Sequence, residues 1–153
     1  MSQLADFSRE EFEVRLANTR VRMQDAGLDA LLVTDPANLH YLTGYNAWSF
    51  YMPQFLFVPA DGDLLLVMRA MDAHGAHHTT WLPREQVAGY PESLVHRAEV
   101  HPMDWAATEL RERGHAARRM RVGYESEAHF FSVRSFLTLQ RRLPEWELVD
   151  SRE

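Results

Sequence analysis

The most constraining feature of this sequence is a helical pattern that passes, almost without a linker, into an apolar strand. Ser8 and Glu11 have the spacing of a capping box, which predicts the start of a helix. One face of the predicted helix carries Phe12, Leu16, Thr19 and Met23. Gly27 is typical of the residue that ends a helix, and the apolar run 28–34 has the length of a strand buried on both faces. This order favours a layered α/β domain.

The rest of the chain continues this alternation of helix and strand. Further helices are predicted at 36–43, 71–81, 102–113 and 132–143, and strands at 55–58, 64–68, 87–90, 121–124 and 146–149. Asp61-Gly62 supplies the turn of a hairpin. The last helix should be capped by Ser132, and Val133, Phe136, Leu137 and Gln140 recur at helical spacing along one face. We therefore predict a three-layer α/β/α fold with a mixed sheet of about five or six strands and helices on both faces.

Composition excludes several classes of protein. The 153 residues suit a single domain, and the absence of cysteine excludes a disulfide framework, a thiol nucleophile and a thiolate metal site. It also fits a reducing cytoplasm, which is the predicted location. The net charge of −6 argues against a nucleic-acid or membrane partner. The first nine residues lack the apolar core of a signal peptide.

The common catalytic motifs are missing. The sequence contains no Gly-x-Gly-x-x-Gly, Walker, Gly-x-Ser-x-Gly or His-Glu-x-x-His pattern. His74, His77 and His78 would share one side of a helix, a geometry that can hold zinc. No carboxylate follows at ligand spacing, so we favour a solvated, partly packed histidine face over a metal site. We predict no catalytic residue and no metal ligand in this chain.

Residues 28–45 carry a recognisable order of motifs. A strand leads into Asp35-Pro36 and then into the run Asn38-Leu39-His40-Tyr41-Leu42-Thr43-Gly44. This segment resembles the N-terminal domain of the creatinase/prolidase/aminopeptidase P family, also called the pita-bread hydrolases. The hairpin at 55–69, the segment 122–125 and the closing segment 143–150 fit the same family in the same order.

The resemblance implies that catalysis takes place in a separate domain of the parent protein. In this family a catalytic pita-bread domain follows in the chain, and in the peptidases it binds two divalent metal ions such as Mn, Co or Zn. Residues 1–153 would then form one non-catalytic domain without a cofactor of its own. Its parent would be a hydrolase of carbon–nitrogen bonds, either ectoine hydrolase-like or Xaa-Pro dipeptidase-like. The domain would contact its own C-terminal catalytic domain, help form a homodimer and control substrate access.

The segment 44–54 is rich in aromatic residues and resembles the ectoine hydrolase branch of the family. Phe50 matches a phenylalanine that faces substrate in creatinase, whereas Met52 stands where creatinase has an arginine. The resemblance predicts substrate binding, at a subunit interface, by Trp48, Phe50, Tyr51 and Met52. The alternative is that these aromatic side chains pack in the core.

A second function from another class stays open. The same fold could serve as a free-standing module that binds a small ligand or a protein, without any catalytic partner.

Overall fold

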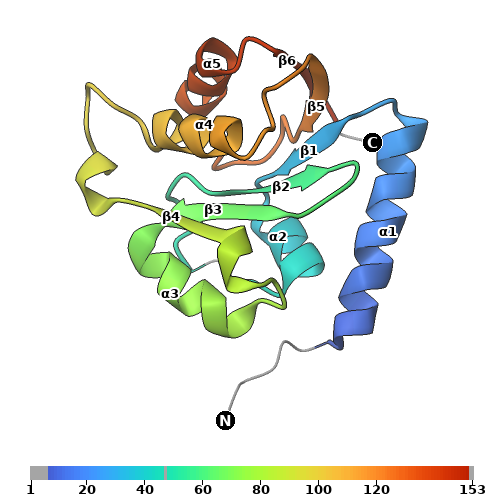
Figure 1. The fold of residues 1–153 in the computed structure, drawn as a ribbon. Coiled ribbons are helices and arrows are strands. Elements are labelled where there is room, and N and C mark those ends of the chain that lie inside the picture. Colours follow the sequence, from blue (N-terminus) through green and yellow to red (C-terminus); the bar gives the residue numbers. More distant parts are fainter. Residues whose placement is uncertain (1–6, 47, 152–153) are drawn as a thin grey trace.

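A mixed sheet forms the middle layer of the fold (Figure 1). The computed structural model describes residues 7–46 and 48–151, and in them six strands lie in the order β4-β3-β2-β1-β5-β6. The strands are β1 (Ala30–Val33), β2 (Phe55–Pro59), β3 (Leu65–Arg69), β4 (Val87–Tyr90), β5 (Met120–Tyr124) and β6 (Trp146–Asp150). The helices are α1 (Arg9–Asp25), α2 (Pro36–Thr43), α3 (Ala70–Thr79), α4 (Pro102–Glu112) and α5 (Val133–Arg142), with short 3₁₀ turns η1 (Arg84–Gln86) and η2 (Glu92–Leu94).

The strand directions bring two distant loops to one edge of the sheet. β1 pairs antiparallel with β2 and parallel with β5, and β5 pairs parallel with β6. On the other side, β2 pairs antiparallel with β3, which pairs parallel with β4. Val33 at the end of β1 lies opposite Leu56 at the start of β2. The α2–β2 loop and the β5–α5 connection therefore meet at this edge.

Helices cover both faces of the sheet, which confirms the predicted three-layer α/β/α class (Figure 1). One core joins α4 and α5 to the sheet, and in it the rings of Phe57 and Trp146 stack with centroids 5.5 Å apart. The other core joins α1, α2 and α3 to the opposite face around Leu56 and Met68. Because each fully buried side chain of this kind contributes roughly 1.5–3 kcal/mol, the two cores together supply most of the stability.

The start of α1 follows the sequence signals closely. The Ser8 hydroxyl accepts a hydrogen bond from the Glu11 amide at 3.2 Å, and the rings of Phe7 and Phe12 meet edge to face at 6.1 Å. Gly27 ends the helix with a φ of 67°, a conformation that favours glycine. The Glu11 carboxylate accepts from Arg15 at 3.1 Å, so among the described residues only half of the predicted capping box forms.

The orientation of α5 differs from the prediction. Ser132 caps the helix as expected, but its buried positions are Ser135, Thr138 and Leu139, and Val133 and Leu137 are exposed. The reason is that α5 packs against α4, where small side chains allow close approach. Next to this helix, the rings of Phe131 and Phe136 both pack against Tyr124.

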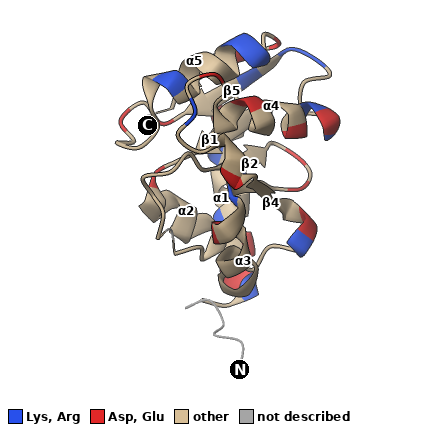
Figure 2. Cartoon of the chain, turned by 90° about the vertical axis from the view of Figure 1, so that its left-hand side faces the viewer, with Lys and Arg blue, Asp and Glu red and all other residues tan. Residues whose placement is uncertain are grey.

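Charged side chains on the outer helices pair with one another. Figure 2 shows basic positions on α5 close to acidic positions on α4. Asp104 lies 3.1 Å from the Arg141 guanidinium and 3.7 Å from that of Arg142, and Arg111 contacts Glu145 at 2.9 Å. These ion pairs partly neutralise the arginines at the outer surface of α4 and α5.

The carboxylate of Glu125, directly after β5, holds the end of β1 and the start of α2 together. One oxygen accepts hydrogen bonds from the amides of Thr34 and Asp35 at 2.6 and 2.7 Å and from the Thr34 hydroxyl at 3.3 Å. The other accepts from the Asn38 side-chain amide at 2.5 Å. The motif residues that carried the family resemblance thus have a structural role at this junction.

We predict that Glu125→Gln lowers the free energy of unfolding by about 1–3 kcal/mol, because an amide NH₂ would face donors that now bind a carboxylate. Urea denaturation measures the change. The matched control is Glu112→Gln, at an exposed position at the end of α4. It should alter stability by less than about 0.5 kcal/mol. Equal effects of the two substitutions would contradict the role of Glu125.

Candidate functional site

The loop between α2 and β2 presents three large aromatic side chains to solvent. Trp48 is 82% exposed, Tyr51 60% and Phe50 40%. Aromatic side chains dominate interface energies, and loops held on a rigid scaffold often carry binding residues. The structure therefore brings together three of the four predicted site residues, and these three do not fill the core.

Met52 differs from these three residues in its exposure. Its side chain is only 5% exposed, so it packs inside the domain and does not face solvent. The sequence gives no sign of this difference, because Met52 follows the exposed Tyr51 directly in the chain. A contact between Met52 and a substrate stays a prediction.

A network of polar groups fixes the loop to the start of α3. The buried Ser49 donates a hydrogen bond from its hydroxyl to the Asp72 carboxylate at 2.9 Å and accepts one from Arg69 at 2.9 Å. Arg69 and Asp72 also contact each other directly at 3.1 Å. Because these groups are mostly removed from water, the loop backbone between Trp48 and Phe50 is held in place.

Tyr45, at the start of the loop, has no role as a base. Its side chain is buried, and burial, followed by the nearby Asp72 carboxylate, raises the pKa of the Tyr45 phenol to about 12. The phenol therefore stays protonated at neutral pH.

Phe130 is a fourth exposed aromatic residue that sequence reasoning missed. It lies in the β5–α5 connection, is 45% exposed, and its ring centroid is 4.8 Å from that of Phe50. We call Trp48, Phe50, Tyr51 and Phe130 the aromatic surface. The signal for Phe130 was its position after a parallel strand, because loops at the carboxyl ends of such strands commonly form binding sites.

The described residues contain no group of three His, Asp or Glu side chains that could hold a metal ion. On α3, His74 and His78 are exposed, whereas His77 is half-buried. Burial, with a smaller effect of Arg84, lowers the pKa of His77. No helix among the described residues is both long and apolar enough to cross a membrane.

Comparison with known proteins places this domain in one family. The sequence model described as the Creatinase/Prolidase N-terminal domain matches residues 15–153, and the chain belongs to this family. Ectoine hydrolase of Halomonas elongata is 37% identical over 147 residues, which are 95% of this chain and 36% of that protein. The chain spans only 36–38% of the length of the curated relatives it matches.

Solved structures share the fold. A proline dipeptidase from Streptococcus pneumoniae superposes with a TM-score of 0.70 at 24% identity, covering 90% of this chain and 91% of that one. A prolidase from Thermococcus sibiricus gives a TM-score of 0.69 at 17% identity, covering 91% of this chain but only 34% of the prolidase chain. The domain therefore occurs as about a third of a longer polypeptide in that structure.

We predict that substitutions at two residues of the loop, Trp48 and Met52, differ strongly in their effect on stability. Trp48→Ala should change the free energy of unfolding by less than about 0.5 kcal/mol, because the side chain is exposed. Met52→Ala should lower it by about 2–5 kcal/mol, because the truncation leaves a cavity. Urea denaturation of both variants measures this contrast. A Trp48→Ala variant as unstable as Met52→Ala would mean that the aromatic surface is part of the core.

Proposed function

We propose that this domain is the non-catalytic N-terminal domain of a hydrolase that cleaves carbon–nitrogen bonds. In this proposal it supports a homodimer, and its aromatic surface controls access of substrate to a catalytic region in the neighbouring subunit. The parent activity would be of the ectoine hydrolase or Xaa-Pro dipeptidase kind, in the cytoplasm. Metal ions, where the parent uses them, would bind outside this domain.

The observation that carries the proposal is the aromatic surface itself. Four large aromatic side chains stand exposed at one edge of the sheet. Trp48, Phe50 and Tyr51 lie on the α2–β2 loop, which Ser49, Arg69 and Asp72 hold in place, and Phe130 on the β5–α5 connection packs against Phe50. Contiguous apolar surface of this kind marks interaction sites in soluble proteins. The similarity to ectoine hydrolase over almost the whole chain supports the choice of parent activity.

The alternative is a free-standing binding module that uses the same aromatic surface without a catalytic partner. Both functions need Trp48 and Phe50 to be exposed, so stability measurements do not separate them. They differ in whether the surface affects the rate of a reaction.

A hybrid enzyme tests this difference, with this domain replacing the matching domain of the Halomonas elongata ectoine hydrolase. We predict that Trp48→Ala with Phe50→Ala lowers kcat/KM of the hybrid about tenfold, because substrate positioning is lost while folding is retained. The control is Val21→Ala, which removes an exposed apolar side chain from α1. Steady-state kinetics measure both. Equal kcat/KM in the two variants would favour the binding module.

A further inference from the structure

One part of the sheet is left uncovered by the helices. A groove of about 580 Å³ lies between the second half of α1 and the sheet, at the ends of β1 and β6. Its lining is mainly apolar and includes Met23, Ala26, Leu28, Leu31, Val149 and Ser151. On this side of the sheet the core packed under α1, α2 and α3 involves strands β1 to β4, so the groove marks the boundary of that core.

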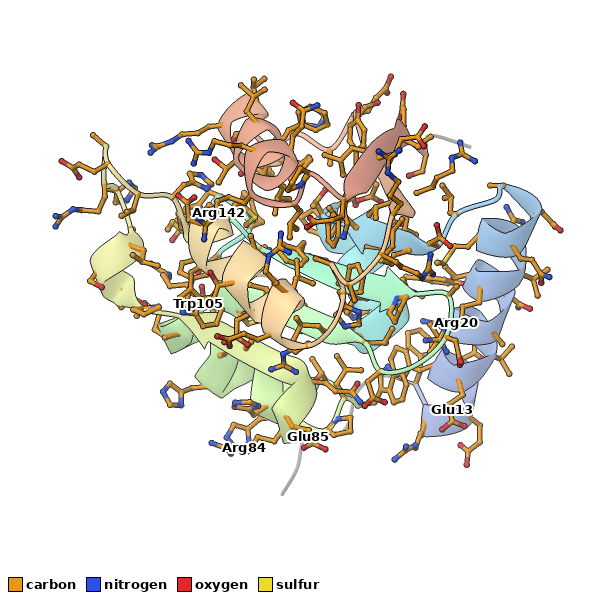
Figure 3. All side chains as sticks on the ribbon, turned by 45° about the horizontal axis from the view of Figure 1, so that its top comes forward. Glu13, Arg20, Arg84, Glu85, Trp105 and Arg142 are labelled. Carbon is orange, nitrogen blue, oxygen red and sulfur yellow. The ribbon has the colours of Figure 1, made fainter. Side chains whose placement is uncertain are left out.

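The walls of the groove are fixed. Arg20 on α1 reaches the β2–β3 turn, donating hydrogen bonds to the carbonyls of Pro59 and Gly62 (Figure 3). Three residues further along α1, the Met23 carbonyl accepts a hydrogen bond from the Leu28 amide at 2.9 Å. The second half of α1, which bounds the groove, is therefore held to the β2–β3 turn and to the segment that leads into β1.

Gly123 of β5 leaves space beside the groove because it has no side chain. A Cβ atom at this position would lie 2.9 Å from Leu28 Cδ1, 3.0 Å from Leu31 Cδ1 and 3.0 Å from Ser151 Cβ. Leu28, Leu31 and Ser151 can close over the strand only because position 123 has no side chain. The apolar lining depends on this close approach.

The position of Ser151 indicates which segment could occupy the groove. After β6, the backbone amide and the hydroxyl of Ser151 both donate to the Tyr124 carbonyl at 2.9 Å, so Ser151 is held beside the end of β5, where it lines the groove. In the relatives the matched region is 36–38% of the protein, and the family model describes an N-terminal domain. More polypeptide therefore follows this domain in those relatives.

We propose that the groove is the docking site for the segment that follows this domain in its longer relatives, and that this segment inserts apolar side chains beside Met23 and Leu31. A segment tethered directly after Ser151 would be at a high effective concentration at the groove, so a modest apolar contact suffices to hold it. This inference rests on family membership and is independent of the role of the aromatic surface.

A peptide-binding experiment on the 153-residue chain tests the proposal. The probe is a fluorescently labelled peptide of the roughly 20 residues that follow the matched region in the Halomonas elongata ectoine hydrolase, a length chosen to span the groove. We expect saturable binding of the peptide. Ala26→Arg should weaken this binding about tenfold, because the larger side chain fills the groove, and Val149→Ala about threefold, because it shortens a wall of the groove. Val21→Arg, on an exposed position of α1 outside the groove, is the matched control and should leave binding unchanged.

Three outcomes would overturn the proposal. The first is no saturable binding up to about 1 mM peptide, the weak limit for a specific contact. The second is binding that the Ala26 and Val149 variants leave unaltered. The third is that something other than the peptide occupies the groove. One sign would be that the dye 1-anilinonaphthalene-8-sulfonate binds in the groove and the peptide does not displace it. The other would be that Ala26→Arg abolishes self-association of the chain in sedimentation, so that a second copy occupies the groove. Urea denaturation of each variant ensures that losses of binding are compared between folded proteins.

Discussion

The hydrogen bonds of Glu125 are the constraint on which the functional edge of this domain depends. β1 and β5 run side by side, and each leads into a loop at the same edge of the sheet. Glu125 begins the loop after β5, and its carboxylate binds the amides of Thr34 and Asp35, where β1 passes into α2. A charged acceptor that binds several donors contributes more than a neutral one. The Glu125 carboxylate thereby fixes the start of α2 against the segment that carries Phe130. α2 in turn leads into the loop that carries Trp48, Phe50 and Tyr51.

In our proposal, this arrangement lets the domain affect a reaction that another part of the parent enzyme catalyses. The sheet and its two cores provide rigidity, whereas the aromatic surface and the groove beside α1 are the places where it can contact other polypeptide. They lie on different elements, the first on the loops after α2 and β5 and the second between α1 and the end of β6. In our account the groove connects the domain to its own chain, and the aromatic surface serves a neighbouring subunit.

Much of the fold could be predicted from the sequence because its signals are local. Ser8, Gly27 and the apolar run after it fix a helix, its end and a strand, and the structure agrees at each point. The prediction of which face of α5 is buried was wrong, because the sequence does not reveal that this helix packs on another helix through small residues such as Ser135. The sequence also did not predict that Phe130 joins the aromatic surface or that Met52 is buried, for a related reason. Both depend on how separate loops meet in space, which periodicity along one segment does not encode.

The central claim is that the aromatic surface of one subunit serves the active site of another. Mixing two forms of the hybrid enzyme tests it most directly: one carries Trp48→Ala with Phe50→Ala, and the other has an inactivated catalytic region. In mixed dimers the intact aromatic surface of the second form would complement the intact catalytic region of the first. Random pairing then predicts recovery of about a quarter of the unaltered hybrid's activity. If the mixture is no more active than the two forms measured separately, the surface does not act across subunits.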